Sequence, residues 1–322
     1  MNPLIKATVT FTEKKLGKGS YGCVKVVKIS NVEYAAKCFH EAQHKWNKKF
    51  IMKYSILTSL RHKNIVSYLG VPSVGDEVLP ILIMEKLICS LHDRLCSTTQ
   101  PPPAFPTKLR ILLDVAEGLC FLHGHHPAII HRDLTAKNVL LDSQGLAKIS
   151  DFGNSTIVQI DQRLTQESTT YFPGAMVYCA PEAMQLHNKY NEKKIDIFSF
   201  GHLSLFVFID EFPLNLLPSV ENQDGQLHAR SEVKRRQMYF DTLRRYAQVH
   251  SQGVQVNEYN ICELLVDCLQ NRPDKRPPAE DLTKFFKNHP LLAAEHDPNL
   301  AQITPTSDQN TCGLFSRHSS IN

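Results

Sequence analysis

The stretch HRDLTAKN at residues 131–138, followed by DFG at residues 151–153, decides how this chain is interpreted. Asp133 is a carboxylate that can orient a hydroxyl group and accept its proton. Asn138 and Asp151 add an amide and a second carboxylate, whose oxygens are hard ligands of the kind that Mg²⁺ prefers. A chance loop containing a salt bridge is the plain alternative, but two such motifs in succession are hard to explain by chance. The stretch therefore predicts a general base beside a magnesium site.

A glycine-rich loop and a lysine lie upstream of this stretch. Residues 17–24 read GKGSYGCV, a G-x-G-x-x-G-x-V pattern, and YAAK ends at Lys37, thirteen residues after Val24. Glycines let the main chain approach phosphate oxygens closely, and the lysine could pair with those oxygens. Taken alone, the loop could equally be a hairpin turn and Lys37 an exposed edge residue. A dinucleotide-binding fingerprint would need a helix after the loop, where Cys23–Ile29 has the composition of a strand.

The rest of the chain predicts strands first and helices afterwards. Short runs rich in β-branched and aromatic residues lie at Val9–Phe11, Cys23–Ile29, Glu33–Phe39, Ile65–Leu69 and Leu79–Met84. Between them, apolar residues from Phe50 to Leu60 recur at helical spacing. Further on, a broad apolar stripe between Thr107 and His125 predicts a long helix, and the apolar run Ile195–Ile209 predicts a buried one. The expected fold class is α+β, with a β-rich N-lobe and a helical C-lobe.

This order of elements also predicts the domain boundaries. We expect one domain over residues 1–295, with an N-lobe at about 8–84, a connecting hinge at 85–89 and a C-lobe at about 90–291. The remaining residues, 296–322, are polar and lack periodicity, which predicts a disordered tail.

Composition narrows the classes of function. The chain has 322 residues, 42 % of them apolar, and a net charge of +4, too small to indicate a nucleic-acid or membrane partner. Nine cysteines occur without a C-x-x-C pair, which is typical of reduced thiols. No signal-peptide pattern is visible, and polar residues interrupt Ile195–Ile209, so it does not read as a membrane span. A cytoplasmic location is expected.

Taken in order from Thr8 to Leu291, these landmarks resemble a eukaryotic protein kinase domain. The resemblance implies a two-lobed fold and transfer of the ATP γ-phosphoryl group to a protein hydroxyl, with ATP and Mg²⁺ as cofactors. It makes Asp133 the catalytic base and Lys37 a phosphate ligand, with Asn138 also catalytic. Asn138 and Asp151 would hold the metal.

The same resemblance implies further residues. Those expected to contact ATP are Leu16, Gly17, Lys18, Gly19, Ser20, Tyr21, Gly22, Cys23, Val24, Ala35, Lys37, Met84, Glu85, Leu87 and Leu140. Among them, Met84 would be the gatekeeper, Glu85–Leu87 the adenine-contacting hinge, and Ala35 and Leu140 the apolar walls around the base. Structural expectations concern Glu182 paired with Arg276, Asp196 bracing the catalytic loop, and a stack of Leu57, Tyr68, His131 and Phe152 between the lobes.

One position departs from the kinase pattern. The helix after Lys37 should carry a glutamate that holds this lysine, but the aligned residue is Lys53, and no acidic residue occurs from Ala42 to Gly75. Two ammonium groups ~4 Å apart would repel by about 4 kcal/mol at an effective dielectric constant of about 20. We therefore expect Lys53 to turn toward solvent, leaving Lys37 to phosphate or to Asp151. On this interpretation Lys53→Glu should raise the rate, and a pseudokinase scaffold that binds nucleotide or a partner without efficient turnover is the alternative.

The residues that usually indicate which hydroxyl a kinase phosphorylates do not agree in this sequence. Thr135 and Ala175 stand where serine/threonine kinases usually carry lysine and threonine, whereas Lys137 lies where tyrosine kinases place arginine. This mixture resembles the tyrosine-kinase-like branch, most of which modifies serine or threonine, and a tyrosine or dual-specificity kinase is the alternative. The basic stretch 231–245 is either a solvated helix face or a docking surface for a partner. A phosphate on the hydroxyl-rich segment 168–171 could dock on Arg132.

Overall fold

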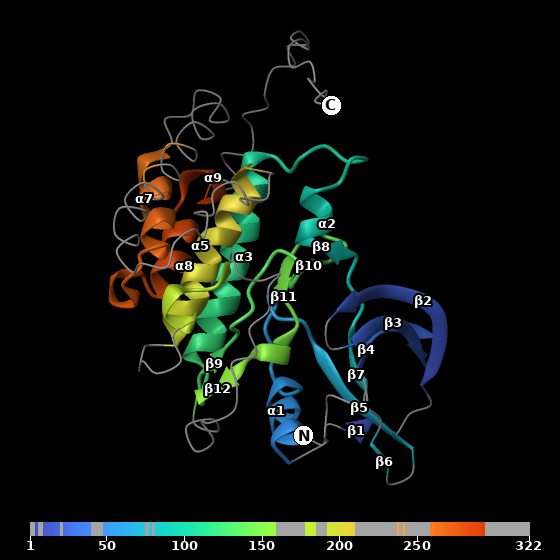
Figure 1. The fold of residues 1–322 in the computed structure, drawn as a ribbon. Coiled ribbons are helices and arrows are strands. Elements are labelled where there is room, and N and C mark those ends of the chain that lie inside the picture. Colours follow the sequence, from blue (N-terminus) through green and yellow to red (C-terminus); the bar gives the residue numbers. More distant parts are fainter. Residues whose placement is uncertain are drawn as a thin grey trace, which may run out of the picture.

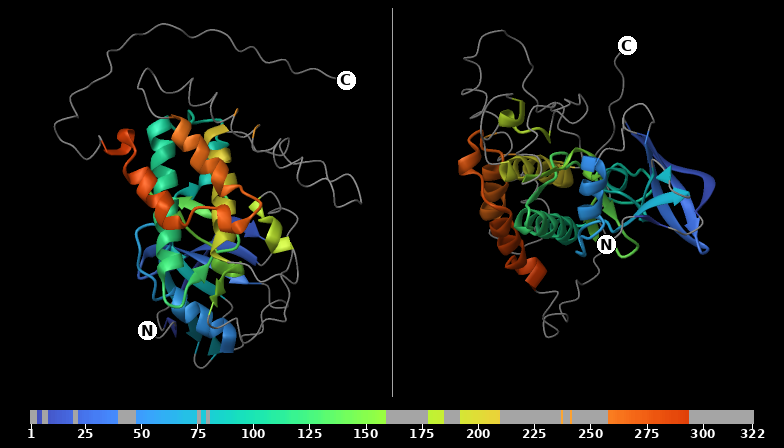
Figure 2. Two further views of the ribbon diagram at one scale, coloured as in Figure 1. Left: turned by 90° about the vertical axis from the view of Figure 1, so that its left-hand side faces the viewer. Right: turned by 90° about the horizontal axis from the view of Figure 1, so that it is seen from below.

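The fold is seen in a computed structural model that describes residues 4–5, 9–19, 22–39, 48–74, 77–78, 81–158, 178–184, 192–209, 237, 241 and 258–293. Strands gather at one end of the molecule and most helices at the other (Figures 1 and 2). The expected α+β fold with a β-rich N-lobe and a helical C-lobe is therefore confirmed. The predicted tail 296–322, the segment 168–171 and most of the basic stretch 231–245 lie outside the described residues.

In the described part of the N-lobe, seven strands form one sheet. Its strands are β1 (Leu4–Ile5), β2 (Thr10–Gly19), β3 (Gly22–Ile29), β4 (Val32–Phe39), β5 (Tyr68–Val74), β6 (Glu77–Val78) and β7 (Ile81–Glu85). They are ordered β1-β5-β7-β4-β3-β2, with β6 paired to β5, and the β1–β5 pair is parallel. Helix α1 (Lys48–Leu57) connects β4 to β5 and packs against β5.

Side-chain alternation gives this sheet two faces with different roles. Val27 and Ala36 belong to a small apolar cluster on one face. Ala35 and Met84 belong to the main core, which continues into the C-lobe. Because successive side chains of a strand point to opposite faces, Lys37 shares the face of Ala35 and is directed toward the C-lobe.

The N-lobe strands differ from the sequence prediction in several boundaries. Strand β2 runs into the glycine loop as far as Gly19, because Lys18 and Gly19 still pair with β3. The predicted strand Ile65–Leu69 is misplaced, since Ile65 forms only an isolated bridge with Ile149 and β5 begins at Tyr68. Strand β1 is two residues long, too short to show an alternating pattern, and the prediction missed it. Helix α1 ends at Leu57, before the predicted Leu60.

The C-lobe is mostly helical. Its elements are β8 (Cys89–Ser90), α2 (Leu91–Leu95), α3 (Phe105–Gly124), β9 (Ile129–Ile130), β10 (Val139–Leu141), β11 (Ala147–Ile149), the 3-10 turn η2 (Phe152–Asn154), β12 (Thr156–Ile157), η4 (Pro181–Met184), α5 (Lys193–Ile209), α7 (Glu258–Cys268), η6 (Pro273–Lys275), α8 (Ala279–Lys287) and α9 (Pro290–Ala293). The two helices predicted from apolar stripes are confirmed as α3 and α5, both lined with buried residues. Helix α3 packs against α8, and α5 packs against α7.

Short strands at the junction of the lobes position the two motifs. Strand β10 pairs with β8 and β11, and β9 pairs with β12, all antiparallel. The catalytic stretch begins directly after β9, and Asp151 follows β11 by two residues. Both loops therefore emerge between the sheet of the N-lobe and the helices of the C-lobe (Figure 1). Among the described residues, every helix is too short or too polar to cross a lipid bilayer.

Candidate active site

Asp196, on the buried helix α5, holds the start of the catalytic stretch. Its carboxylate accepts hydrogen bonds from the main-chain N–H groups of His131 and Arg132, each at 2.8 Å, and contacts the His123 ring at 2.9 Å. Arg132 has a left-handed φ of 64°, a conformation that costs energy outside glycine and persists where surrounding contacts fix it. Burial alone would raise the pKa of Asp196, but the hydrogen bond and charge of His123 lower it. The predicted bracing role of Asp196 is confirmed.

Asp133 receives hydrogen bonds from its own motif and from the residue that follows the DFG triplet. The Asn138 side chain donates to the Asp133 carbonyl at 2.7 Å, and Asn154 donates to the Asp133 carboxylate at 3.2 Å. Burial raises the pKa of this carboxyl; the charge of His131 opposes the rise and that of Asp151 adds to it. The loop thus brings the predicted base and the Asn138 amide together.

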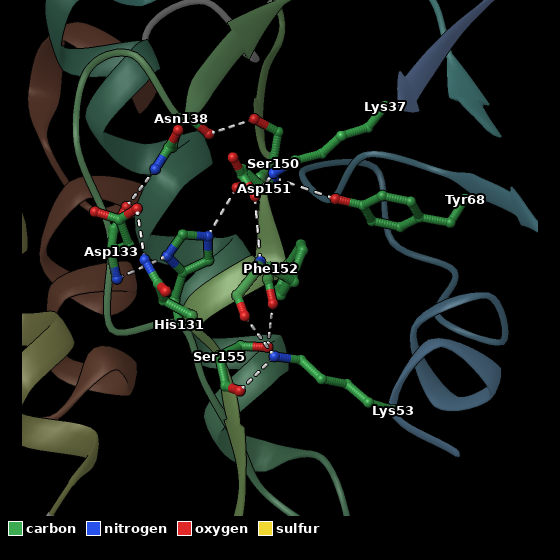
Figure 3. A network of polar contacts seen from close by, with 12 residues as sticks. Lys37, Lys53, Tyr68, His131, Asp133, Asn138, Ser150, Asp151, Phe152 and Ser155 are labelled. Atoms are coloured by element: carbon green, nitrogen blue, oxygen red, sulfur yellow. Dashed lines mark hydrogen bonds and ion pairs between the residues drawn. The ribbon is translucent and has the colours of Figure 1, made fainter. Parts of the chain in front are cut away.

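Lys37 and Asp151, which lie 114 residues apart in the chain, form an ion pair of 2.6 Å (Figure 3). Asp151 has a left-handed φ of 58°, and its main-chain N–H donates to the Tyr68 hydroxyl at 3.2 Å. Its partial burial would raise the pKa of the carboxyl, but the Lys37 ammonium lowers it below the ordinary value. Asp151 is therefore held in its charged form, as a metal ligand has to be.

The predicted stack between the lobes is present. The Phe152 ring lies edge-on to Tyr68 at 5.9 Å and to His131 at 5.0 Å, measured between ring centroids. Leu57, at the end of α1, is fully buried in the same core. Edge-to-face aromatic pairs of this kind contribute about 0.5–1.5 kcal/mol beyond the area they bury. The stack joins α1 and β5 of the N-lobe to the catalytic stretch.

The expectation that Lys53 turns toward solvent is wrong. Its ammonium group donates to the main-chain carbonyls of Gly153 at 2.9 Å and Ser155 at 2.7 Å (Figure 3). The turn after Asp151 presents these carbonyls toward α1. Their oxygens accept hydrogen bonds from the Lys53 ammonium group, so this lysine has partners without a nearby carboxylate. Because Lys37 takes Asp151 and Lys53 takes the carbonyls, the two ammonium groups have separate partners.

The residues expected around the adenine base lie on one side of the sheet. Ala35 and Met84 are register partners on β4 and β7 and are both buried. Val24, Leu87 and Leu140 are partly buried and pack against the same core.

The predicted hinge and glycine loop are described in part. The Glu85 carboxylate accepts hydrogen bonds from the Ser67 N–H and from Lys148, the latter at 2.8 Å. At Gly22 a Cβ atom would lie 1.9 Å from the Cys38 carbonyl oxygen, so this position requires glycine. Cys23 on β3 lies opposite Cys38 on β4 in the strand register, and both are free thiols. Gly17 has open space around it, Leu16 is 43 % exposed, and Ser20 and Tyr21 lie outside the described residues.

Two contacts flank the catalytic stretch. The predicted pair between Glu182 and Arg276 is confirmed, with two hydrogen bonds of 2.5 and 2.8 Å. The Arg132 guanidinium, proposed to receive a phosphate, donates to the Thr156 hydroxyl at 2.9 Å.

Sequence reasoning missed the contacts of Asn154 and Lys148. No motif marks either position, although Asn154 directly follows the DFG triplet and could have been considered for that reason.

This arrangement can support a specific set of chemical steps. Asn138 and Asp151 offer amide and carboxylate oxygens, a donor set that suits Mg²⁺. Asp133 can accept a hydrogen bond from a hydroxyl, and Lys37 can neutralise phosphate charge. No cluster of histidine, cysteine, aspartate and glutamate suited to another metal occurs among the described residues.

Comparison with known proteins agrees with this geometry. A family model described as protein kinase domain matches residues 11–288. A U-box domain-containing protein 35 of Arabidopsis thaliana is 35 % identical over 63 % of this chain and 24 % of its own length. From the same organism, a wall-associated receptor kinase-like 5 is 31 % identical over 85 % of this chain and 37 % of its own length. An LRR receptor-like serine/threonine-protein kinase is 28 % identical over 97 % and 32 %. The chain therefore spans 24–37 % of the length of these relatives.

Proposed function

The chain belongs to the protein kinase family, and from this premise we propose that it transfers the γ-phosphoryl group of ATP to a serine or threonine hydroxyl of a protein. The observation that carries the proposal is the 2.6 Å pair between Lys37 and Asp151, formed beside Asp133 and Asn138. Phosphoryl transfer demands positioning and charge neutralisation more than covalent chemistry. These four side chains supply both.

Each residue has a role in this proposal. Lys37 binds phosphate oxygens, and Asp133 orients the acceptor hydroxyl and takes its proton. Asn138 and Asp151 hold Mg²⁺, which neutralises phosphate charge when bound. The glycine loop 17–24 covers the phosphates, and Ala35, Met84 and Leu140 enclose the adenine base.

The finer classification is also a proposal. The mixed pattern at Thr135 and Lys137 supports the tyrosine-kinase-like branch, and a relative named as a serine/threonine-protein kinase supports that acceptor type. A protein substrate, a docking partner at the basic stretch 231–245 and a cytoplasmic location are further proposals from the sequence.

A pseudokinase is the second candidate, and Lys53 is the observation that favours it. Against it, the Lys37–Asp151 pair forms without the missing glutamate. We therefore place the active enzyme first.

A transfer assay separates these candidates. Purified protein is incubated with labelled ATP, Mg²⁺ and a mixture of protein substrates, with Asp133→Asn as the control, and the labelled amino acids are then identified. We expect phosphoserine or phosphothreonine with the wild type and none with Asp133→Asn. Phosphotyrosine alone would overturn the acceptor class, and no transfer at all would leave the pseudokinase as the better hypothesis.

A further inference from the structure

The contacts of Lys53 fall on a single turn of the chain. This lysine belongs to α1, and its two carbonyl acceptors, Gly153 and Ser155, are the residues on either side of Asn154. The partners lie about a hundred residues away along the chain, at separations of 100 and 102. The Lys53 ammonium group therefore binds the main chain on both sides of Asn154.

That side chain reaches the predicted base. Asn154 donates from Nδ2 to Oδ2 of Asp133 at 3.2 Å. The turn that carries it is closed by further hydrogen bonds, because the N–H and the hydroxyl of Ser155 both donate to the Phe152 carbonyl, at 3.2 and 2.8 Å. These bonds hold the main chain on both sides of Asn154, from which its side chain extends to Asp133.

These contacts form a continuous path from the N-lobe to the catalytic stretch. It runs from α1 through Lys53 to the main chain at Gly153 and Ser155, and from there through Asn154 to Asp133. Figure 3 shows Lys53, Ser155 and Asp133, which lie along this path. The Lys37–Asp151 pair meets the same turn from another side, because the Gly153 N–H donates at 3.2 Å to the Asp151 carboxylate oxygen that pairs with Lys37. The orientation of α1 is thus linked to the direction of the Asp133 carboxylate.

We propose that Lys53 is a positioning residue, which docks α1 onto the turn at 153–155 and, through Asn154, orients the carboxylate of Asp133 for the transfer reaction. The inference rests on the proposed kinase function. It gives the position of the absent glutamate a different role, in which hydrogen bonding to main-chain carbonyls takes the place of pairing with Lys37. On this proposal Lys53 supports catalysis, and its presence does not indicate a pseudokinase.

Kinetics of five variants, one of them a control, test the proposal. We expect Lys53→Met to lower kcat about tenfold or more with little change in KM for ATP, because small displacements of a catalytic group have large effects on rate. Lys53→Arg keeps a cationic donor and should recover most of the activity. Asn154→Ala should lower kcat similarly, and the double variant Lys53→Met/Asn154→Ala should be little slower than either single variant. Lys284→Met, at an exposed position on α8, is the charge-matched control.

Several outcomes would overturn it. Wild-type kcat in Lys53→Met contradicts a positioning role, and so does failure of Lys53→Arg to exceed Lys53→Met. Losses that multiply in the double variant would show that Lys53 and Asn154 act independently. Absence of transfer by the wild type would instead contradict the proposed function.

Hydrogen exchange tests the docking of α1 without any turnover, so it applies even if the wild type transfers no phosphate or a variant is inactive. Hydrogen exchange of peptides spanning 48–57 and 152–157 should be faster in Lys53→Met than in the wild type, while Lys53→Arg and Lys284→Met stay close to the wild type. Unchanged exchange in both peptides of Lys53→Met would show that Lys53 does not anchor the helix.

Discussion

At the scale of single residues, Lys53 shows how a substitution at one position changes the partners of several others. A glutamate there would hold Lys37, as the resemblance to other kinases led us to expect. In this chain Lys37 is held by Asp151, and Lys53 bonds to two carbonyl oxygens. The change from a negative to a positive side chain at this position is therefore matched by a change of partner, from an ammonium group to carbonyl oxygens.

The structure reverses the expectation that Lys53→Glu raises the rate. A carboxylate at this position would face the carbonyl oxygens of Gly153 and Ser155, which it cannot bond and which repel it. We expect a lower kcat and a lower melting temperature than the wild type, measured by the transfer assay and by thermal unfolding. A faster variant would mean that the new carboxylate turns to Lys37 and that the carbonyl contacts are dispensable.

At the scale of elements, buried charges connect helices and loops within the C-lobe. Asp114 joins α3 to β11, since its carboxylate accepts from the Ala147 N–H at 3.0 Å. Arg276 joins η6 to η4 through Glu182. Asp114 and Arg276 are each about 1 % exposed, so neither charge is solvated and each depends on its protein partners.

Asp114 predicts a specific dependence of stability on pH. Burial, the largest cause, raises the pKa of its carboxyl from 3.8 to about 6 in spite of its hydrogen bonds. Between these values the folded protein holds a proton that the unfolded chain has lost, so this residue makes the free energy of unfolding fall as pH rises. The loss is about 3 kcal/mol, at 1.36 kcal/mol per pKa unit.

Asp114→Asn removes this titration and keeps an oxygen acceptor for Ala147. Urea unfolding from pH 4 to 7 should show the variant gaining stability relative to the wild type as pH rises, with the difference levelling off above about pH 6. Asp281→Asn, at an exposed position on α8, should show no comparable trend. A constant difference between Asp114→Asn and the wild type would mean that Asp114 is charged throughout this range.

The Glu182–Arg276 pair predicts a non-additive pair of substitutions. Arg276→Met leaves the Glu182 carboxylate buried without its counter-charge, and we expect a loss of about 3–5 kcal/mol in the free energy of unfolding. Glu182→Met/Arg276→Met removes both charges and should be less destabilised than the sum of the single variants. Denaturant unfolding of the wild type, Glu182→Met, Arg276→Met and the double variant measures this coupling. Simple additivity of the losses would show that the pair contributes nothing specific.

At the scale of the whole molecule, the two lobes meet through side chains from both. Tyr68 and Lys37 come from the N-lobe sheet. Their partners His131, Asp151 and Phe152 come from the segments that follow β9 and β11. A ligand that contacts Lys37 and Asp151 together therefore bridges the lobes. Such a ligand should stabilise the folded protein as a unit.

We expect MgATP to provide this stabilisation. At a concentration about 100 times its Kd, it should raise the free energy of unfolding by about 2.7 kcal/mol. Thermal unfolding with and without MgATP measures the effect, and Asp151→Asn should weaken it because a proposed metal ligand is lost. A wild-type protein that shows no shift at millimolar MgATP would contradict nucleotide binding, and the enzyme proposal with it.

The sequence by itself determined the family, the order of the lobes and the candidate residues for the reacting groups. These follow from local patterns: glycines and charged residues at set spacings, two apolar helical stripes, and alternating strands. Such patterns are complete within a few residues, so they can be recognised without knowing how the chain packs. Strand β1 and the start of β5 were missed or misplaced because pairing with distant strands, and not local composition, selects them.

Tertiary structure alone decided the partners of Lys53, the contact of Asn154 with Asp133 and the raised pKa of Asp114. Each depends on groups that are remote in the chain or on burial in the assembled lobe. A sequence displays the charges of its side chains, so the partners it suggests for Lys53 are ionised groups only. Main-chain carbonyls are present at every residue and become specific acceptors only when the fold brings a turn and a helix together.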